Sequence, residues 1–327
     1  MLKRFFIILI IIGAILICIK ILSQPKQNIN QSLPSNSSST NISLITIPQL
    51  RQRSFPGSTI TLEKKVASTE SYDQYISYYQ SDGLKIYALL TIPKGQKPTG
   101  GWPVIVWNHG AADPKKYGKT NDDQIGKTLT TKGYLTFQPS YRGYATSDGD
   151  PNTPQGAVID DLNAIASIKK YPDANGQKIG VAGHSMGGAV TLFDLVIAKD
   201  LKAASILAGD LTPLSDKIKQ AEGQNGTAKS TDVQKLFKKY GTPESNPTFW
   251  NSLDPFNYLS DISIPVQLQA GTADQTVPWQ VSENAYHKLK ALGKNIEFEK
   301  VEGADHILYQ NAGVMERTIT FFNRHLK

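Results

Sequence analysis

The sequence predicts an α/β fold, in which a mainly parallel β-sheet is flanked by helices. Short apolar runs alternate along the chain with longer segments of helical periodicity, and this alternation is typical of a parallel sheet covered on both faces. The run 104–107 is apolar throughout, as a strand buried on both sides requires. The segment 178–188 indicates a strand, a tight turn at a serine and the start of a helix.

The first predicted strands are joined by short turns. Segments 60–66, 75–79 and 84–92 are rich in β-branched and aromatic residues, and Ser81-Asp82-Gly83 is a typical hairpin turn between the last two. Further strands are predicted at 104–107, 133–138, 178–182, 203–207, 266–270 and 296–301. Helices are predicted at 121–132, 155–170, 187–198, 278–292 and 313–326.

Residues 1–22 have the pattern of a targeting segment. Lys3 and Arg4 precede fifteen uninterrupted apolar residues, and no small-residue cleavage site follows. We expect an uncleaved membrane anchor, with a removed signal peptide as the alternative. The basic pair ahead of the apolar run favours an extracytoplasmic domain, which would be secreted if the segment were cleaved.

Residues 23–57 are polar and include the low-complexity stretch 35–40. Such a composition buries too little apolar area to offset the entropy of ordering, so we expect a disordered tether. The folded domain is expected at 58–327. Residues 212–261 interrupt its strand–helix alternation, and an insertion of this size over the strand ends is usually a cap on a pocket.

The net charge of +7 is concentrated at the N-terminal end. Residues 1–62 carry six basic and no acidic side chains, which leaves 29 basic and 28 acidic side chains in the rest. The folded part is nearly neutral, so no nucleic-acid partner is expected. The single cysteine, Cys18, lies in the apolar run, so we expect neither an internal disulfide nor a thiolate metal site.

Ser185 is the candidate nucleophile. It is the centre of Gly183-His184-Ser185-Met186-Gly187, a Gly-x-Ser-x-Gly pattern between a predicted strand and a predicted helix. The two glycines allow a turn so tight that larger side chains would collide with neighbouring strands. Such a turn raises the serine hydroxyl at the strand end and aims the first N–H groups of the helix at the reaction centre.

A serine nucleophile needs a base and an orienting carboxylate, which follow this type of turn in the order acid, then base. Among the five histidines, only His306 lies in a loop that follows a strand after Ser185. Asp274 follows the predicted strand 266–270, in a loop that a glycine opens and a proline closes. The alternatives for the acid are Asp254, Asp261 and Asp305.

Attack on a carbonyl carbon creates an oxyanion that pre-placed N–H groups stabilise. One donor is expected from Met186, directly after the nucleophile. The second is expected from Ala111, in the loop after the strand that ends at Trp107, with Gly110 allowing the backbone to come close. His109 of the same loop is expected to shape the pocket rather than to act as a base.

Residues from about 75 to the C-terminus resemble the catalytic domain of the prolyl oligopeptidase family, within the α/β-hydrolase superfamily. The matching pieces occur in the order of the family: SDGLKI (81–86), PVIVWNHG (103–110), YRGY (141–144), GHSMGG (183–188), GTAD (271–274) and GADH (303–306). The resemblance implies a mainly parallel eight-stranded sheet with an inserted cap. It also implies Ser185, Asp274 and His306 as nucleophile, orienting acid and base.

The stretch 141–144 is expected beside the active site. We assign Tyr141 to the pocket, and we expect Arg142 to pair with a carboxylate that braces this loop or, as the alternative, to contact the substrate.

These residues predict a serine hydrolase that cleaves an ester or peptide bond through an acyl-enzyme. The alternatives are a carboxylesterase without peptidase activity and a non-catalytic surface binding module. The expected partners are a small ester or short peptide and, through residues 1–22, a membrane. No cofactor or metal is expected, because the sequence has no zinc-binding His-Glu-x-x-His, phosphate loop or dinucleotide fingerprint.

Overall fold

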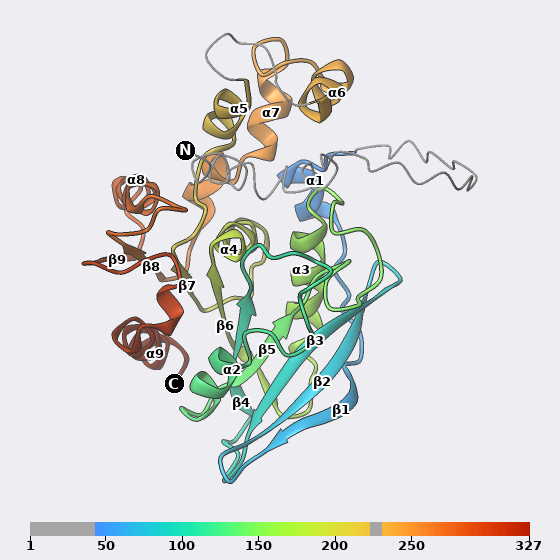
Figure 1. Ribbon diagram of the computed structural model, residues 1–327, viewed down its shortest axis with the longest axis vertical. Helices are drawn as coiled ribbons and strands as arrows, with labels where there is room; N and C mark the ends of the chain where they lie inside the picture. Colours follow the sequence, from blue (N-terminus) through green and yellow to red (C-terminus); the bar gives the residue numbers. More distant parts are fainter. Residues whose placement is uncertain (1–42, 223–230) are drawn as a thin grey trace, which may run out of the picture.

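The computed structural model describes residues 43–222 and 231–327, and one mixed β-sheet runs through them (Figure 1). Its strands are β1 (Thr61–Ser68), β2 (Tyr72–Ser81), β3 (Leu84–Pro93), β4 (Trp102–Asn108), β5 (Leu135–Pro139), β6 (Ala174–His184), β7 (Ala203–Leu207), β8 (Val266–Gly271) and β9 (Ile296–Val301). They lie in the order β1-β2-β3-β5-β4-β6-β7-β8-β9. The sheet is antiparallel from β1 to β5 and parallel from β5 to β9, which confirms the predicted class.

The eight strands that the resemblance implies are one too few, because the described sheet has nine, which match the nine segments predicted from the sequence. The strand β1 pairs with β2 at the antiparallel edge, with register shifts between Leu62 and Lys64 and between Lys65 and Ala67. Most of its residues are exposed. It therefore widens the edge of the sheet without adding to the buried centre, where β4, β6, β7 and β8 lie.

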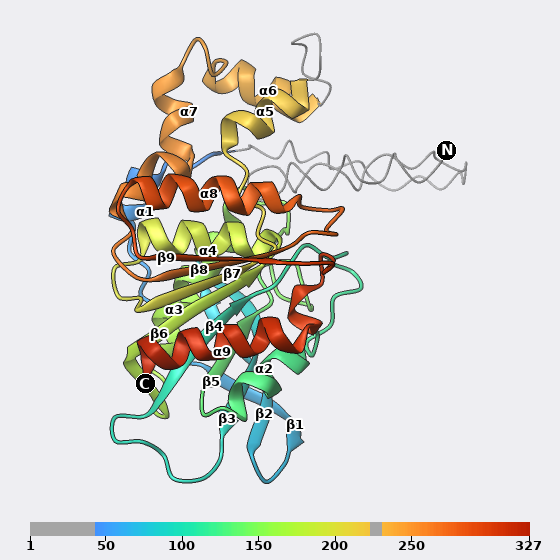
Figure 2. The same cartoon turned by 90° about the vertical axis from the view of Figure 1, so that its left-hand side faces the viewer.

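Helices cover both faces of the sheet (Figure 2). One face carries α1 (Ile47–Gln52), α3 (Gly156–Ile168), α4 (Met186–Ile197) and α8 (Trp279–Ala291), and the other carries α2 (Asp123–Thr130) and α9 (Ala312–Leu326), which the short η4 (Leu308–Gln310) precedes. Every residue of α4 is buried, because this helix lies between the sheet and its neighbours α3 and α1. Because helices cover both faces, the side chains on both sides of the central strands are mostly apolar.

The predicted tether is wrong in its last part. Residues 47–52 form the helix α1, which starts at a capping box between Thr46 and Gln49. Ile47 and Leu50 lie one turn apart and are fully buried, and α1 contacts α4 and α7 (Pro247–Leu253). Burial of these two apolar side chains offsets the conformational entropy that is lost when the helix forms. The polar residues around them bury too little apolar area to do so.

The predicted anchor, residues 1–22, and the tether residues 23–42 lie outside the described residues. Within the described ranges, no helix has both the length and the apolar character that a membrane span needs.

The insertion between β7 and β8 is helical. It contains α5 (Leu214–Glu222), α6 (Thr231–Tyr240), α7 (Pro247–Leu253) and the 3₁₀ helix η3 (Pro255–Asp261). Helices α5, α6 and α7 stand together at one end of the molecule, beyond the end of β6 (Figure 1). Their aromatic rings pack on one another, with Tyr240 stacked on Phe249 at 4.4 Å and Phe237 edge-on to Trp250 at 5.6 Å. We call this segment the cap.

Candidate active site

Ser185 lies in the turn between β6 and α4, with φ of 55° and ψ of −119°. A side chain other than glycine rarely adopts this backbone conformation, and a nucleophile elbow is one place that requires it. A Cβ on Gly183 would come within 2.2 Å of the carbonyl oxygen of Gly187, and a Cβ on Gly187 within 2.0 Å of that of Asn108. Both glycines are therefore required by contact with backbone atoms.

His306 lies between Ser185 and Asp274. Its Nε2 is 2.9 Å from Ser185 Oγ, and its Nδ1 is 2.7 Å from Asp274 Oδ2. An ionised carboxylate only accepts hydrogen bonds, so Nδ1 carries the hydrogen and Nε2 is free to accept the serine hydroxyl hydrogen. The structure thus brings together the three residues that were predicted as nucleophile, acid and base.

Asp274 is oriented by its own loop. Its Oδ1 accepts hydrogen bonds from the backbone N–H groups of Thr276, at 2.8 Å, and Val277, at 2.9 Å, which leaves Oδ2 directed at His306. These two backbone bonds fix the orientation of the carboxyl group. The three alternative acids, Asp254, Asp261 and Asp305, bond to other groups, which are Leu214, Arg51 and Ile307.

Met186 and Ala111, the predicted oxyanion donors, line the same cavity as Ser185. Met186 is the first residue of α4, so its N–H is one of those that a helix leaves without an internal acceptor. Gly110 lies against the turn, because a Cβ there would be 3.3 Å from the Cβ of Ser185. Its missing side chain lets residues 108–111, which we call the oxyanion loop, reach the nucleophile.

His109, Gly110 and Tyr141 were assigned to the pocket, and none of them lines the cavity over Ser185. The ring of His109 is stacked between those of Tyr117, at 4.3 Å, and Tyr141, at 4.4 Å, and both His109 and Tyr141 are only 1% exposed. The hydroxyl of Tyr141 donates to Asn108 Oδ1 over 3.0 Å. These rings therefore support the oxyanion loop from within the core. Stacked there, they are more completely buried than they would be in the wall of the cavity.

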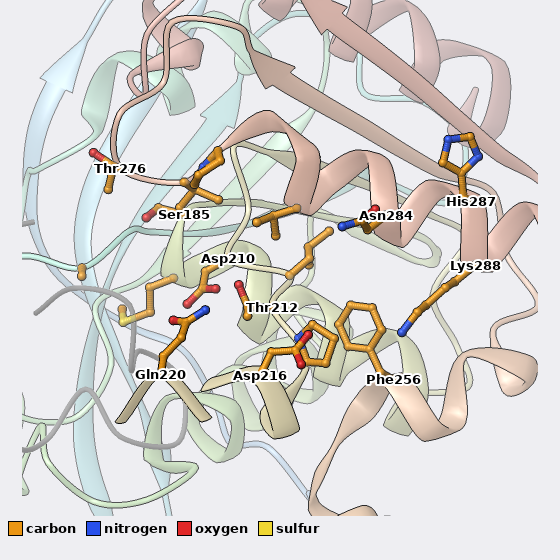
Figure 3. A pocket seen from close by; sticks show the side chains of 17 residues that line it. Ser185, Asp210, Thr212, Asp216, Gln220, Phe256, Thr276, Asn284, His287 and Lys288 are labelled. Carbon is orange, nitrogen blue, oxygen red and sulfur yellow. The ribbon is translucent and has the colours of Figure 1, made fainter. Parts of the chain in front are cut away.

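The cavity over Ser185 has a volume of about 610 Å³ and lies between the cap helix α5 and α8 (Figure 3). Val277, Pro278 and Val281 give it an apolar wall on the α8 side. Ser185 lies at one end, and His287 and Lys288 lie at the other (Figure 3). Among the residues with described positions, no group of three or more His, Cys, Asp or Glu side chains is arranged to hold a metal ion.

Asp210 is a cavity residue that sequence reasoning missed. Its backbone N–H donates to the carbonyl oxygen of Ser185 over 3.0 Å, and its Oδ2 accepts from Lys217 Nζ of the cap over 2.9 Å. Both side chains of this ion pair are buried. It ties the cap to the nucleophile turn, and no local pattern in the sequence signals it.

Arg142 braces the loop beside the site, as predicted. Its Nε and Nη2 bond to Asp160 of α3 at 3.0 and 2.8 Å, and its backbone N–H adds a third bond at 2.7 Å. Arg142 is 6% exposed and does not line the cavity, so the alternative of substrate contact is wrong.

Comparisons with known proteins identify the family of this chain. The model of the prolyl oligopeptidase family matches residues 121–327, more than half of the chain. YtmA, an uncharacterized peptidase of Bacillus subtilis (strain 168), is 26% identical over 225 residues, which are 68% of this chain and 82% of the relative.

Two solved structures share the fold at low identity. An acetyl xylan esterase from Paenibacillus sp. R4 has a TM-score of 0.64 at 17% identity, over 86% of this chain and 92% of that one. The acylaminoacyl peptidase of Pyrococcus horikoshii has a TM-score of 0.59 at 22% identity, over 79% of this chain and 42% of that one. They confirm the α/β-hydrolase fold. Since the family model covers more than half of its length, this chain belongs to the prolyl oligopeptidase family and is a serine hydrolase.

Proposed function

We propose that the protein cleaves an ester or amide bond by a two-step acyl transfer. Ser185 attacks the carbonyl carbon while His306 takes the hydroxyl proton on Nε2 and then gives it to the leaving group. Asp274 keeps the ring in the required tautomer and stabilises its charged form. Water then attacks the acyl-enzyme, with His306 again as the base, which releases the acid and restores the serine.

The contacts of His306 carry this proposal. Its ring lies 2.9 Å from Ser185 Oγ and 2.7 Å from Asp274 Oδ2, which is the geometry that proton transfer needs. A non-catalytic binding module needs neither these contacts nor a serine at positive φ. Because strained backbone costs free energy, its presence at Ser185 supports catalysis over simple binding.

The N–H groups of Met186 and Ala111 are the proposed oxyanion donors. Both residues line the cavity beside Ser185. A donor of this kind is typically worth about 10² to 10³ in rate, because it meets charge that develops only in the transition state.

The cavity supports a small ester or a short peptide as the substrate. Its volume of about 610 Å³ lies within the range of about 300 to 1,000 Å³ that small-molecule pockets have. A carboxylesterase without peptidase activity is the second candidate. The apolar wall of Val277, Pro278 and Val281 favours it, because such a wall suits an acyl group and offers nothing to a peptide backbone.

The test uses the full-length protein and a fluorophosphonate probe. We expect labelling of the wild type that is lost in Ser185→Ala and kept in Ser205→Ala, a matched control at a buried serine of β7 whose hydroxyl bonds to Gln267. The kcat/KM values on short acyl esters and on peptide anilides then separate esterase from peptidase. A folded wild type that is not labelled would contradict the proposal and favour the binding module.

A further inference from the structure

A buried polar cluster lies beneath the oxyanion loop. Asn108 is the last residue of β4, and its Nδ2 lies 3.1 Å from each of three acceptors. These are Asp161 Oδ2 on α3 and Thr191 Oγ1 and Asp194 Oδ2 on α4. All four side chains are 0% exposed. The proposed reaction gives none of these groups a direct part. Burial of polar groups costs free energy unless they are hydrogen-bonded, so the bonds within the cluster need an explanation.

The two carboxyl groups of this cluster need a proton. The amide of Asn108 has two hydrogens for three acceptors, and the Oδ1 atoms of Asp161 and Asp194 have no hydrogen-bond donor. Asp161 Oδ2 and Asp194 Oδ2 each lie 3.1 Å from the same amide nitrogen, so the two carboxyl groups are close neighbours. If both were ionised, two buried negative charges would lie beside one amide, whereas one proton held by the pair removes one of these charges.

The surroundings of the pair disfavour a second negative charge. Burial raises the pKa of Asp161 to about 6 and raises the pKa of Asp194 well above its usual range. The neighbouring Asp160 raises the pKa of Asp161 further, and its own partner is Arg142. The other titratable neighbours are the neutral hydroxyls of Tyr79 on β2 and Tyr141. No lysine or arginine in the described ranges pairs with either carboxyl of the cluster.

Asn108 also connects this cluster to both proposed oxyanion donors. Its backbone runs into the oxyanion loop, which ends at Ala111, and its carbonyl oxygen packs against Gly187 so closely that a Cβ there would come within 2.0 Å. Its side chain holds Thr191 and Asp194 of α4, the helix that begins with Met186. The side-chain amide therefore ties the strand that leads to one donor to the helix that supplies the other.

We propose that Asn108 is a positioning residue for the oxyanion hole, and that Asp161 and Asp194 hold its amide as a pair with one proton between them. The first part rests on the proposed function, because it concerns the donors of that reaction. The second part is a statement about the folded protein and is testable without any substrate.

The positioning role is tested by the split between kcat and KM on a short acyl ester. We expect Asn108→Ala to lower kcat on the order of 10- to 100-fold with KM within about threefold, because misplaced donors weaken binding of the transition state. The matched control is Asn163→Ala. Asn163 is also a buried asparagine, but it lies on α3, and its amide bonds to Ser81 and Ile159 away from the site. It should keep the wild-type kcat. An unchanged kcat in Asn108→Ala overturns the positioning role.

A milder variant covers the case in which Asn108→Ala does not fold. Tyr141→Phe keeps the stacked ring and removes only the hydroxyl that donates to Asn108 Oδ1. We expect the same direction with a smaller size, a loss in kcat of about threefold to tenfold with KM unchanged. Equal kcat in Tyr141→Phe and the wild type counts against the proposal.

The shared proton is counted by the pH dependence of unfolding. In the unfolded chain both carboxyls ionise above about pH 4, whereas the folded pair keeps one proton, so the contribution of this pair to stability falls as pH rises. The double variant D161N/D194N has nothing to titrate there. From about pH 5 upward, the unfolding equilibrium constant of the wild type relative to this variant should rise about tenfold per pH unit, until the folded pair loses its proton.

Two results overturn the single-proton pair. A ratio independent of pH means that both groups are ionised in the fold, and a rise of about a hundredfold per pH unit means that both are protonated. Fluorophosphonate labelling of wild-type Ser185 reports the proposed function separately. If the wild type is labelled and Asn108→Ala keeps its kcat, only the inference fails. An unlabelled wild type defeats the proposed function, while the proton count still decides the second part.

Discussion

The ring Nε2 of His184 donates a hydrogen bond to the backbone carbonyl oxygen of His306 over 2.7 Å. The residue before Ser185 therefore holds the loop that carries His306. The two rings lie 4.7 Å apart, and His184 is 5% exposed. The distance between Ser185 and His306 thus depends on a contact made by the nucleophile turn itself, and sequence reasoning assigned His184 no role.

His184 makes the fold sensitive to acid. Its burial and the nearby His306 lower its pKa to about 4, whereas an unfolded histidine has a pKa of about 6.5. Below pH 6.5 the unfolded state therefore binds more protons at this residue, and the contribution of His184 to stability falls as pH drops toward 4. We expect wild-type stability to fall by about 2 kcal/mol relative to His184→Phe between pH 6.5 and 5, as measured by urea unfolding. A pH-independent difference in stability between the wild type and His184→Phe would refute the prediction.

Asp274→Asn should lower kcat by about 10⁴-fold, because an amide at this position favours the wrong tautomer of His306. Asp305→Asn is the matched control, since Asp305 is exposed and bonds only to the backbone N–H of Ile307. It should leave kcat unchanged. The measurement is steady-state hydrolysis of a short acyl ester, and equal rates in the two variants would move the acid to another residue.

The Arg142–Asp160 pair should be essential to the fold. Arg142→Ala leaves a fully buried carboxylate without its cation, and such losses typically cost about 3 to 5 kcal/mol. The control Arg324→Ala breaks an exposed pair with Glu297, worth about 1 kcal/mol or less. Denaturant unfolding of the two variants provides the check. Similar losses in both would show that burial of the Arg142 pair does not matter.

Filling the cavity should change which esters are cleaved. Val281→Trp narrows the space between α8 and α5, so kcat/KM for long acyl esters should fall on the order of tenfold while acetyl esters are little affected. Leu292→Trp, at a residue 48% exposed, controls for the added ring. If both chain lengths lose activity equally, the acyl group does not occupy this cavity.

Most of the fold and the three central site residues follow from local patterns in the sequence. Gly183, Ser185 and Gly187 are visible in the sequence as a Gly-x-Ser-x-Gly pattern, and the structure shows that backbone atoms leave no room for a Cβ at either glycine. Asp274 and His306 could be predicted because each lies in a loop that directly follows a strand, β8 for Asp274 and β9 for His306. Helix α1 escaped detection because two apolar residues in a polar segment carry too weak a periodic signal.

Only the tertiary structure decided which buried polar groups meet. Asn108 contacts Asp161 across 53 residues and His184 contacts His306 across 122, and no spacing in the chain records either pairing. Likewise, only the structure shows that His109 and Tyr141 lie in the core and that the cavity lies between α5 and α8. Local patterns such as a tight turn can be recognised from neighbouring residues. The partner of a buried side chain depends instead on how distant elements pack, and that packing exists only once the sheet has formed.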